Sequence, residues 1–319
     1  MSSLPDGSVR PKTRSSWPAA LLLAGIGSLP LVGWVGGRHW LPNLLNHFQA
    51  QYFVILVVCC TLLLIRRRFR PALLAACLLT IPGLRLAPLW IPPAPSGDDA
   101  PLKIATFNVL GSNERHAETV AWLRREQPDF VYLCETTEEW THALDALDVS
   151  LPHAINHPLD GSFGFVFRSR FPVREKEITL HGALGLPLLN VVLESPGGPV
   201  RVLGAHPVPP VSRFWAGEHA VYLDAVARTA EGSELPTVIL GDLNSTPWCH
   251  RLRPIFDAGF RDSARGRGWS ATWSRNNPLI ALPIDHILSR GVGPCMSRQL
   301  GPDLGSDHRP VVAGFTFKP

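Results

Sequence analysis

Charged residues are scarce in this chain of 319 residues: Asp, Glu, Lys and Arg make up 18% of it, whereas 45% is apolar. So apolar a composition excludes a disordered polymer, and the length excludes a small domain held together by disulfides. No internal repeat is visible. The chain is therefore expected to contain a large apolar core.

The six cysteines follow no pattern that would indicate a zinc site or a disulfide framework. Three of them lie in apolar segments of the first hundred residues. The other three, Cys134, Cys249 and Cys295, are an odd number. At least one of these thiols must stay unpaired within the chain, so the cysteine count does not decide the redox compartment.

Basic residues are distributed unevenly along the chain. The first hundred residues contain nine Lys and Arg against three acids, a net charge of +6, and the remainder contains 21 against 23, a net charge of −2. The second part therefore lacks the basic excess that concentrates a protein on the phosphate backbone of nucleic acids.

Residues 1–91 are predicted to form a membrane anchor with about three transmembrane helices, near 17–37, 45–65 and 71–90. The first two segments carry no charge and approach the ~20 residues that a helix needs to cross the hydrocarbon layer. The third is weaker, because Arg85 and two prolines interrupt it. A cleaved signal peptide is the alternative for the first segment, but a second long apolar segment directly behind it favours a retained anchor.

Lys and Arg predict the orientation of these helices, since cytoplasmic flanks carry most of the positive charge. One basic group precedes the first span and another follows the second. With three crossings, the rest of this multi-pass protein of the cell membrane lies outside the cytoplasm. If residues 71–90 only lie in the interface, two crossings return it to the cytosol. The two groups are Arg10, Lys12 and Arg14, and Arg66, Arg67, Arg68 and Arg70.

A Pro-rich linker, residues 92–101, separates the anchor from a domain at 102–319. In this domain many short β-rich segments alternate with a few helical patterns, which predicts an α+β fold with two packed β-sheets flanked by helices. The strands are expected near 102–109, 129–135, 186–194, 199–206, 236–242 and 309–317, and the helices near 116–127 and 213–229.

Polar side chains stand where many of these strands begin or end, which gathers acids, amides and imidazoles at one rim of a sheet. Carboxylate and amide oxygens suit a hard cation such as Mg²⁺, and His beside carboxylates suits proton transfer. Each residue alone has a simpler explanation, such as a turn, a helix cap or a core histidine. The set is Asn108, Glu135, His206, Asp242, Asn244, Asp285, Asp307 and His308. His286 is predicted to be structural, because neighbours on a strand face opposite ways.

Five motifs in this order resemble those of the endonuclease/exonuclease/phosphatase superfamily, which includes DNase I-like nucleases, sphingomyelinases and inositol polyphosphate phosphatases. The resemblance covers roughly residues 102–317. It implies a DNase I-like layered α/β sandwich and hydrolysis of phosphate esters with Mg²⁺, or Mn²⁺ as the alternative. The motifs are TFNV (106–109), CE (134–135), GDLNSTPW (241–248), IDHIL (284–288) and SDHRPV (306–311).

The resemblance also implies roles for single residues. Glu135 resembles the principal metal ligand, with Asn108 and Asp307 in the shell around metal and phosphate. His308 resembles the histidine that orients or activates the attacking water, held by Asp285.

On the same basis, Asp242 and Asn244 resemble the pair that positions the nucleophile and stabilises the phosphoryl charge. His206 resembles a histidine near the leaving or non-bridging oxygen. Trp248 and His250 follow the GDLN motif closely enough to line the rim of the site. The identity of the formal general base stays open.

The sequence thus predicts a membrane-anchored, metal-dependent phosphoesterase. A catalytic domain tethered at the lipid bilayer meets lipid-borne phosphates at high effective concentration, so a lipid-linked substrate is favoured and nucleic acid is disfavoured. The alternatives are a metal-dependent nuclease and a catalytically inert membrane scaffold. The exact phosphate bond and the oligomeric state stay open.

Overall fold

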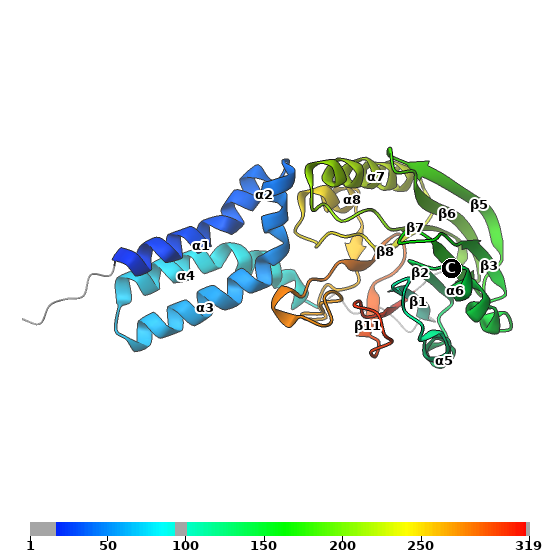
Figure 1. Cartoon of the computed structure of the whole chain (residues 1–319), viewed down its shortest axis with the longest axis horizontal. Helices are drawn as coiled ribbons and strands as arrows, with labels where there is room; N and C mark the ends of the chain where they lie inside the picture. Colours follow the sequence, from blue (N-terminus) through cyan, green and yellow to red (C-terminus); the bar gives the residue numbers. More distant parts are fainter. Residues whose placement is uncertain (1–16, 93–100, 317–319) are drawn as a thin grey trace, which may run out of the picture.

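The computed structural model describes residues 17–92 and 101–316. A bundle of helices and a layered α/β domain lie end to end (Figure 1). Most of the predicted linker, residues 93–100, lies outside the described residues, as do the basic residues Arg10, Lys12 and Arg14.

The bundle consists of three long helices that lie side by side, with short helices at the end nearest the α/β domain (Figure 1). The loop between the second and third long helices holds Arg66, Arg67 and Arg68 and lies at the opposite end of the bundle. The elements are α1 (Trp17–Gly36), α2 (Trp40–Leu45), η1 (Asn46–Phe48), α3 (Gln49–Ile65), α4 (Phe69–Leu86) and η2 (Ala87–Leu89).

Two helices of the described part are long and apolar enough to cross a membrane, Trp40–Ile65 and Phe69–Leu89. The apolar helix Leu23–Gly36 within α1 is shorter than these two. Length and composition are weak evidence when they stand alone, because the core helix of a soluble protein meets the same criteria. How much of the apolar surface of these helices is exposed therefore distinguishes a membrane span from the core helix of a soluble protein.

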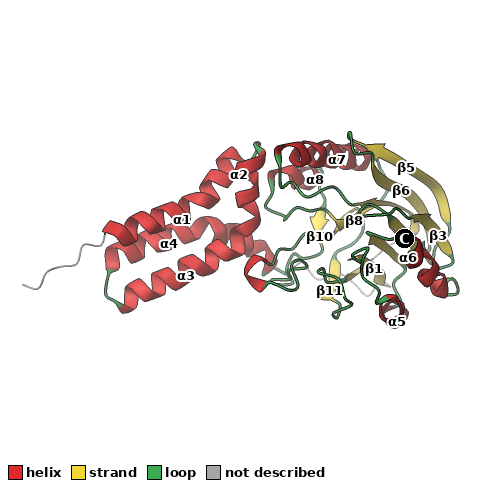
Figure 2. Cartoon of the chain, viewed as in Figure 1, coloured by secondary structure: helices red, strands yellow, loops and turns green. Residues whose placement is uncertain are grey.

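The α/β domain contains two six-stranded mixed β-sheets packed face to face (Figure 2). The first has the order β11-β12-β1-β2-β4-β3, with β11 Cys295–Leu300, β12 Val311–Thr316, β1 Pro101–Asn108, β2 Phe130–Cys134, β4 Phe165–Ser169 and β3 His153–His157. The second has the order β5-β6-β7-β8-β10-β9, with β5 Val173–His181, β6 Leu186–Ser195, β7 Gly198–Ala205, β8 Thr237–Asp242, β10 Asp285–Arg290 and β9 Arg261–Asp262.

Helices cover the outer face of each sheet, so the central strands are buried on both sides. Ile104 and Tyr132 point into the core between the sheets, whereas Phe107 and Leu133 point to the helices. Continuous apolar strands such as Phe130–Cys134 follow from this double burial. The helices are α5 (His116–Glu126) and α6 (Glu138–Leu144) on the first sheet, and α7 (Arg213–Glu231) and α8 (Arg253–Asp257) on the second, with 3-10 turns η3 (Asp145–Leu147), η4 (His250–Leu252) and η5 (Pro278–Ile280). The predicted sandwich of two packed sheets flanked by helices is confirmed.

Two glycines allow the sheets to approach each other closely at Tyr132. A Cβ atom on Gly204 would overlap the Tyr132 ring, and one on Gly241 would overlap the carbonyl oxygen of Ala205. Gly241 also has a φ of 134°, a backbone conformation that side chains other than glycine rarely adopt. Gly241, the first residue of the GDLN motif, therefore has a structural role, and the acid Asp242 follows it directly.

The bundle docks on the α/β domain through specific polar contacts. The Asn43 side chain accepts a hydrogen bond from the His250 backbone amide at 2.9 Å, and the Trp248 indole donates to the carbonyl oxygen of Arg85 at 2.9 Å. Gln51 donates to the carbonyl oxygen of Ala281 at 3.1 Å. Trp248 and His250 thus contact the helices, and neither lines the cavity at the polar strand ends, so their predicted placement at its rim was wrong.

Candidate active site

The topology of the two sheets brings the polar strand ends together. In each sheet two central strands run parallel, β1 with β2 and β7 with β8, so their carboxyl ends lie at one edge. β10 and β12 run antiparallel to β8 and β1, so their first residues and the residues before them reach the same edge. Asp242 and Asp285 are direct partners in the β8–β10 register.

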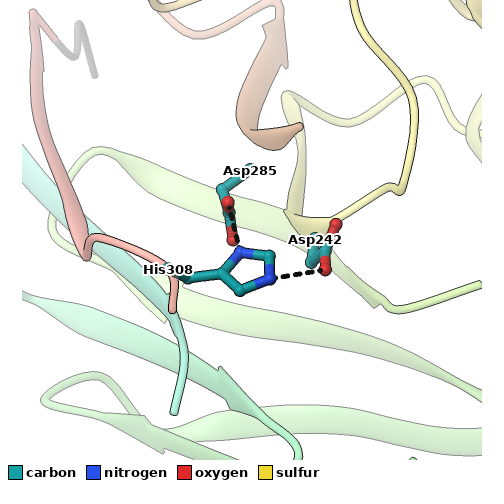
Figure 3. A group of neighbouring side chains, drawn as sticks. All are labelled: Asp242, Asp285 and His308. Atoms are coloured by element: carbon teal, nitrogen blue, oxygen red, sulfur yellow. Dashed lines mark hydrogen bonds and ion pairs between the residues drawn. The ribbon is translucent and has the colours of Figure 1, made fainter. Parts of the chain in front are cut away.

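His308 lies between two buried aspartates (Figure 3). Its Nδ1 atom is 2.9 Å from Oδ2 of Asp285, and its Nε2 atom is 3.6 Å from Oδ2 of Asp242. The Ser306 hydroxyl accepts the His308 backbone amide at 3.0 Å, and the Thr272 hydroxyl accepts the Asp285 amide at 3.1 Å. A hydroxyl side chain therefore holds the backbone of each member of the His–Asp pair.

Asn108 connects this group to Glu135. Its side-chain amide donates to Oε1 of Glu135 at 2.8 Å and to Oδ2 of Asp242 at 3.1 Å. Its side-chain oxygen Oδ1 accepts a hydrogen bond from the Leu110 backbone amide at 3.1 Å. The Asn108 amide therefore bridges the carboxylates of Glu135 and Asp242, which would otherwise repel each other.

Glu135 and Asn244 adopt left-handed backbone conformations, with φ of 61° and 47°. Such conformations cost free energy for residues other than glycine and cluster at functional sites. A glycine at position 135 would relieve the strain but would lack the carboxylate. The strain indicates that the side chain itself is needed.

His206 follows β7 and faces the same carboxylates. Its Nε2 atom lies 3.8 Å from Oε1 of Glu135 and 3.6 Å from Oδ2 of Asp242, and its ring packs on Phe163 at a centroid distance of 5.5 Å. Asn244 is held by a hydrogen bond of 2.9 Å from its amide to the carbonyl oxygen of Pro207.

Burial shifts the protonation equilibria of these groups in a common direction, towards the neutral form. It raises the pKa of Glu135 and of Asp242 and lowers the pKa of His206. The His308–Asp285 pair is the exception. Burial opposes its charges, but the carboxylates of Asp285 and Asp242 raise the pKa of His308 to about 10, and the charge and hydrogen bond of His308 lower the pKa of Asp285.

Most of these side chains line a cavity of about 520 Å³. Among the described residues that line it there are three carboxylates and three histidines but no Lys or Arg, so neither of these side chains is available there for an anionic substrate. The apolar lining includes Trp273, Leu282 and Ile284, a loop that runs from Pro209 to Val211, and Trp215. The cavity thus combines an acidic floor with apolar walls.

The donor set of the cavity fits a divalent cation. The charge of Asp307 contributes to the raised pKa of Glu135, so these carboxylates repel each other, and a cation between them would remove that repulsion. Ligand atoms of Asp242, Asp285 and His308 also lie within 4.8 Å of one another and are a second possible cation site. Oxygen-rich donors of this kind suit Mg²⁺ or Mn²⁺.

Comparison with protein families now identifies the fold. The profile of the Endonuclease/Exonuclease/phosphatase family matches residues 105–308, more than half of the chain. The chain belongs to this family. This match confirms the superfamily predicted from the motifs. Members of the family are hydrolases of phosphate esters that depend on divalent metal ions. Comparison with curated proteins gives no match.

Several solved structures share the fold of the α/β domain. An endonuclease/exonuclease/phosphatase from Beutenbergia cavernae is 20% identical with a TM-score of 0.57, over 68% of this chain and 72% of that one. TDP2 from D. rerio, complexed with a single-strand DNA product, is 19% identical with a TM-score of 0.58, over 68% and 99%. Sphingomyelinase C from Streptomyces griseocarneus is 17% identical with a TM-score of 0.50, over 67% and 99%.

Within this family domain the structure places all eight predicted site residues at one edge of the sandwich. All but Asn108 and Asp285 line the cavity. Asn108 contacts the lining residue Glu135, and Asp285 contacts the lining residue His308. The roles assigned to them stay predictions. His286 faces away, with Nδ1 2.7 Å from Asp262 and Nε2 2.7 Å from the carbonyl oxygen of Ser245, as expected of a structural histidine.

The residues that the helical bundle contributes to the cavity were not among those predicted from the sequence. Leu44, His47 and Phe48 belong to α2 and η1 and line it together with the family residues. A signal was present, because His47 is an isolated ionisable residue in an otherwise uncharged apolar segment, where such residues usually serve a function.

Proposed function

We propose that the protein is a membrane-anchored phosphoesterase that uses Mg²⁺ or Mn²⁺ to hydrolyse a lipid-linked phosphate at the outer face of the membrane. One observation carries this proposal. The cavity joins an acidic, histidine-containing floor without Lys or Arg to apolar walls, and part of those walls comes from the helical bundle. A bound metal and an amphiphilic phosphate ester together complement such a cavity.

Glu135 and Asp307 are the carboxylates that we assign to the metal, and Asn108 belongs to the surrounding shell, where its amide holds Glu135. When bound, the metal would neutralise phosphate oxygens and lower the pKa of water. The Asp242–Asp285–His308 group is the alternative site. We prefer the first set, because His308 and Asp285 already bind each other at 2.9 Å.

The remaining residues orient the substrate and move protons. His308 holds or transfers a proton at Nε2, the ring nitrogen that Asp285 does not bind. Burial lowers the pKa of His206, so its neutral ring can donate one hydrogen bond to a phosphate oxygen. Asp242 and Asn244 line the cavity together with the two histidines and position the attacking water.

The exposure of the helices supports a membrane location. Only 17% and 28% of the most apolar windows of the two candidate spans are buried, so most of their apolar surface would face water outside a membrane. On the α/β domain, Val211 and Leu279 are 63% and 80% exposed, close to elements that contact the bundle. The basic α3–α4 loop lies at the far end of the bundle, which supports an exterior catalytic domain.

A nuclease is the second candidate, because TDP2 with its single-strand DNA product has the same fold. The net charge of −2 after residue 100 and the absence of Lys and Arg among the described cavity residues argue against it. An inert scaffold is disfavoured, because it has no need for an acidic residue held in a strained conformation, as Glu135 is at the site.

The full-length protein in detergent, supplied with Mg²⁺, tests the proposal against a panel of sphingomyelin, a polyprenyl diphosphate, an inositol phosphate and plasmid DNA. We expect release of phosphate or of the phosphorylated headgroup from one of the lipids at a rate well above that for DNA. Cleavage of DNA alone would establish the nuclease instead.

A further inference from the structure

The helical bundle contributes three side chains to the wall of the catalytic cavity, and one of them is polar. Leu44 comes from α2, and His47 and Phe48 come from η1. All three precede the family domain, which starts at residue 105. This part of the wall is therefore a feature of this chain and is separate from the catalytic set of the family.

His47 is buried in this wall without a hydrogen-bond partner. Its side chain is 5% exposed, and neither Nδ1 nor Nε2 has a partner among the described residues. The two asparagines next to it on α2 and η1 are engaged elsewhere: Asn43 accepts from His250, and Asn46 accepts from Arg85 at 2.7 Å and donates to Gly33. An unpaired buried imidazole costs free energy, which a ligand with a suitable polar atom would recover.

The surroundings of His47 define the rest of such a ligand. Leu44 and Phe48 flank it, and the loop with Pro210 and Val211 and the side chain of Trp215 form further apolar wall of the same cavity. Val211 and Trp215 are 63% and 39% exposed, so the apolar lining reaches the surface. A ligand that fits has an oxygen near His47 and a hydrocarbon chain beside it.

We propose that η1 forms a substrate subsite, in which His47 hydrogen-bonds an oxygen of the phosphorylated headgroup and Leu44 and Phe48 contact the start of the lipid chain. The inference rests on the proposed phosphoesterase function. It makes the bundle a part of the active site, which selects lipid phosphates over soluble esters with the same bond.

His47→Leu in the full-length protein tests this subsite, with His47→Asn as the variant that keeps a polar group. His39→Leu is the matched control, because His39 is exposed and lies before α2. The substrates are a polyprenyl diphosphate and sphingomyelin in mixed micelles and bis(p-nitrophenyl) phosphate in solution. KM and kcat are measured for each, together with the thermal unfolding temperature.

We expect His47→Leu to raise KM for the lipid that the wild type hydrolyses by about tenfold, the effect of one lost hydrogen bond. kcat for bis(p-nitrophenyl) phosphate should stay within about twofold of wild type. His47→Asn should recover part of the loss, and His39→Leu should have no effect. Unfolding temperature should stay unchanged or rise, because the substitution removes an unpaired buried polar group.

An unchanged KM for the lipid, or equal losses for lipid and soluble esters, would overturn the subsite while leaving phosphoesterase activity intact. A fall in unfolding temperature together with equal losses would assign His47 to structure. If the wild type hydrolyses neither kind of ester, the proposed function itself fails, which is a distinct outcome.

Discussion

Oδ2 of Asp285 lies 2.9 Å from Nδ1 of His308, and their side chains are 0% and 7% exposed. This contact leaves Nε2 as the ring nitrogen directed at Asp242 and the cavity. The tautomer and the orientation of the imidazole are therefore set by one carboxylate, while a second carboxylate faces the nitrogen that can exchange a proton.

The first prediction concerns this pair. His308→Ala and Asp285→Ala should each lower kcat by on the order of 10² to 10⁴, the range of a positioned acid or base. The double variant should be no slower than the slower single variant, since each residue acts through the other. A rate that falls by the full product of both effects would show that the two act independently.

The second prediction concerns the metal. Glu135→Gln keeps a side chain that can accept from Asn108 but loses the charge that holds a hard cation. We expect turnover to fall by about 10² or more and Mn²⁺ binding, measured by titration calorimetry, to weaken, while the unfolding temperature of the metal-free protein hardly changes. Glu138→Gln on the exposed start of α6 is the control. A near wild-type rate at saturating Mg²⁺ would remove Glu135 from the metal site.

The third prediction concerns pH and the Asp262–His286 pair behind the site. Burial opposes both charges, but their attraction lowers the pKa of Asp262 and raises the pKa of His286. The contribution of His286 is complete below its unfolded pKa of about 6.5 and is lost as pH rises through its higher folded pKa. The contribution of Asp262 is present above about pH 4 and is lost as pH falls through its lower folded pKa.

The double variant Asp262→Asn, His286→Gln removes both titrations. Its unfolding temperature should fall furthest below wild type between about pH 4 and pH 6.5, and the difference should shrink as pH rises further, through the raised pKa of His286. Thermal unfolding in a buffer series measures this. A difference that stays constant across the series would mean that the pair is not charged in the folded protein.

The fourth prediction concerns topology. Three crossings, with the α3–α4 loop in the cytoplasm, place the α/β domain outside. Alkaline phosphatase fused after Pro319 in a bacterial host should therefore be active, and green fluorescent protein fused there should be dark. A bright fluorescent fusion with an inactive phosphatase fusion would place the domain in the cytosol and exclude an outer-leaflet substrate.

The sequence predicted the sandwich and the rim because both follow from local patterns. Each polar residue at the rim stands at the end of a short apolar strand, and strands that bury both faces show that apolar pattern directly. Asn108, Glu135 and Asp242 could thus be assigned to one edge before the order of the strands was known. The motif order then specified the family.

Contacts between distant segments were not predictable in the same way. Trp248 and His250 are near the GDLN motif in sequence, yet they contact the bundle, because the chain turns away from the cavity after Asn244. His47 lies far from every motif, and only the docking of α2 and η1 brings it to the cavity. Short-range patterns carry no information on such docking.

The most direct test of the phosphoesterase site is the initial rate of bis(p-nitrophenyl) phosphate hydrolysis by the full-length protein as free Mg²⁺ is varied. We predict no turnover in excess EDTA, a saturable rise in rate when Mg²⁺ or Mn²⁺ is added back, and no such rise in Glu135→Gln. Turnover that persists in EDTA, or a wild type that stays inactive with either metal on this ester and on every lipid of the panel, would contradict a metal-dependent phosphoesterase.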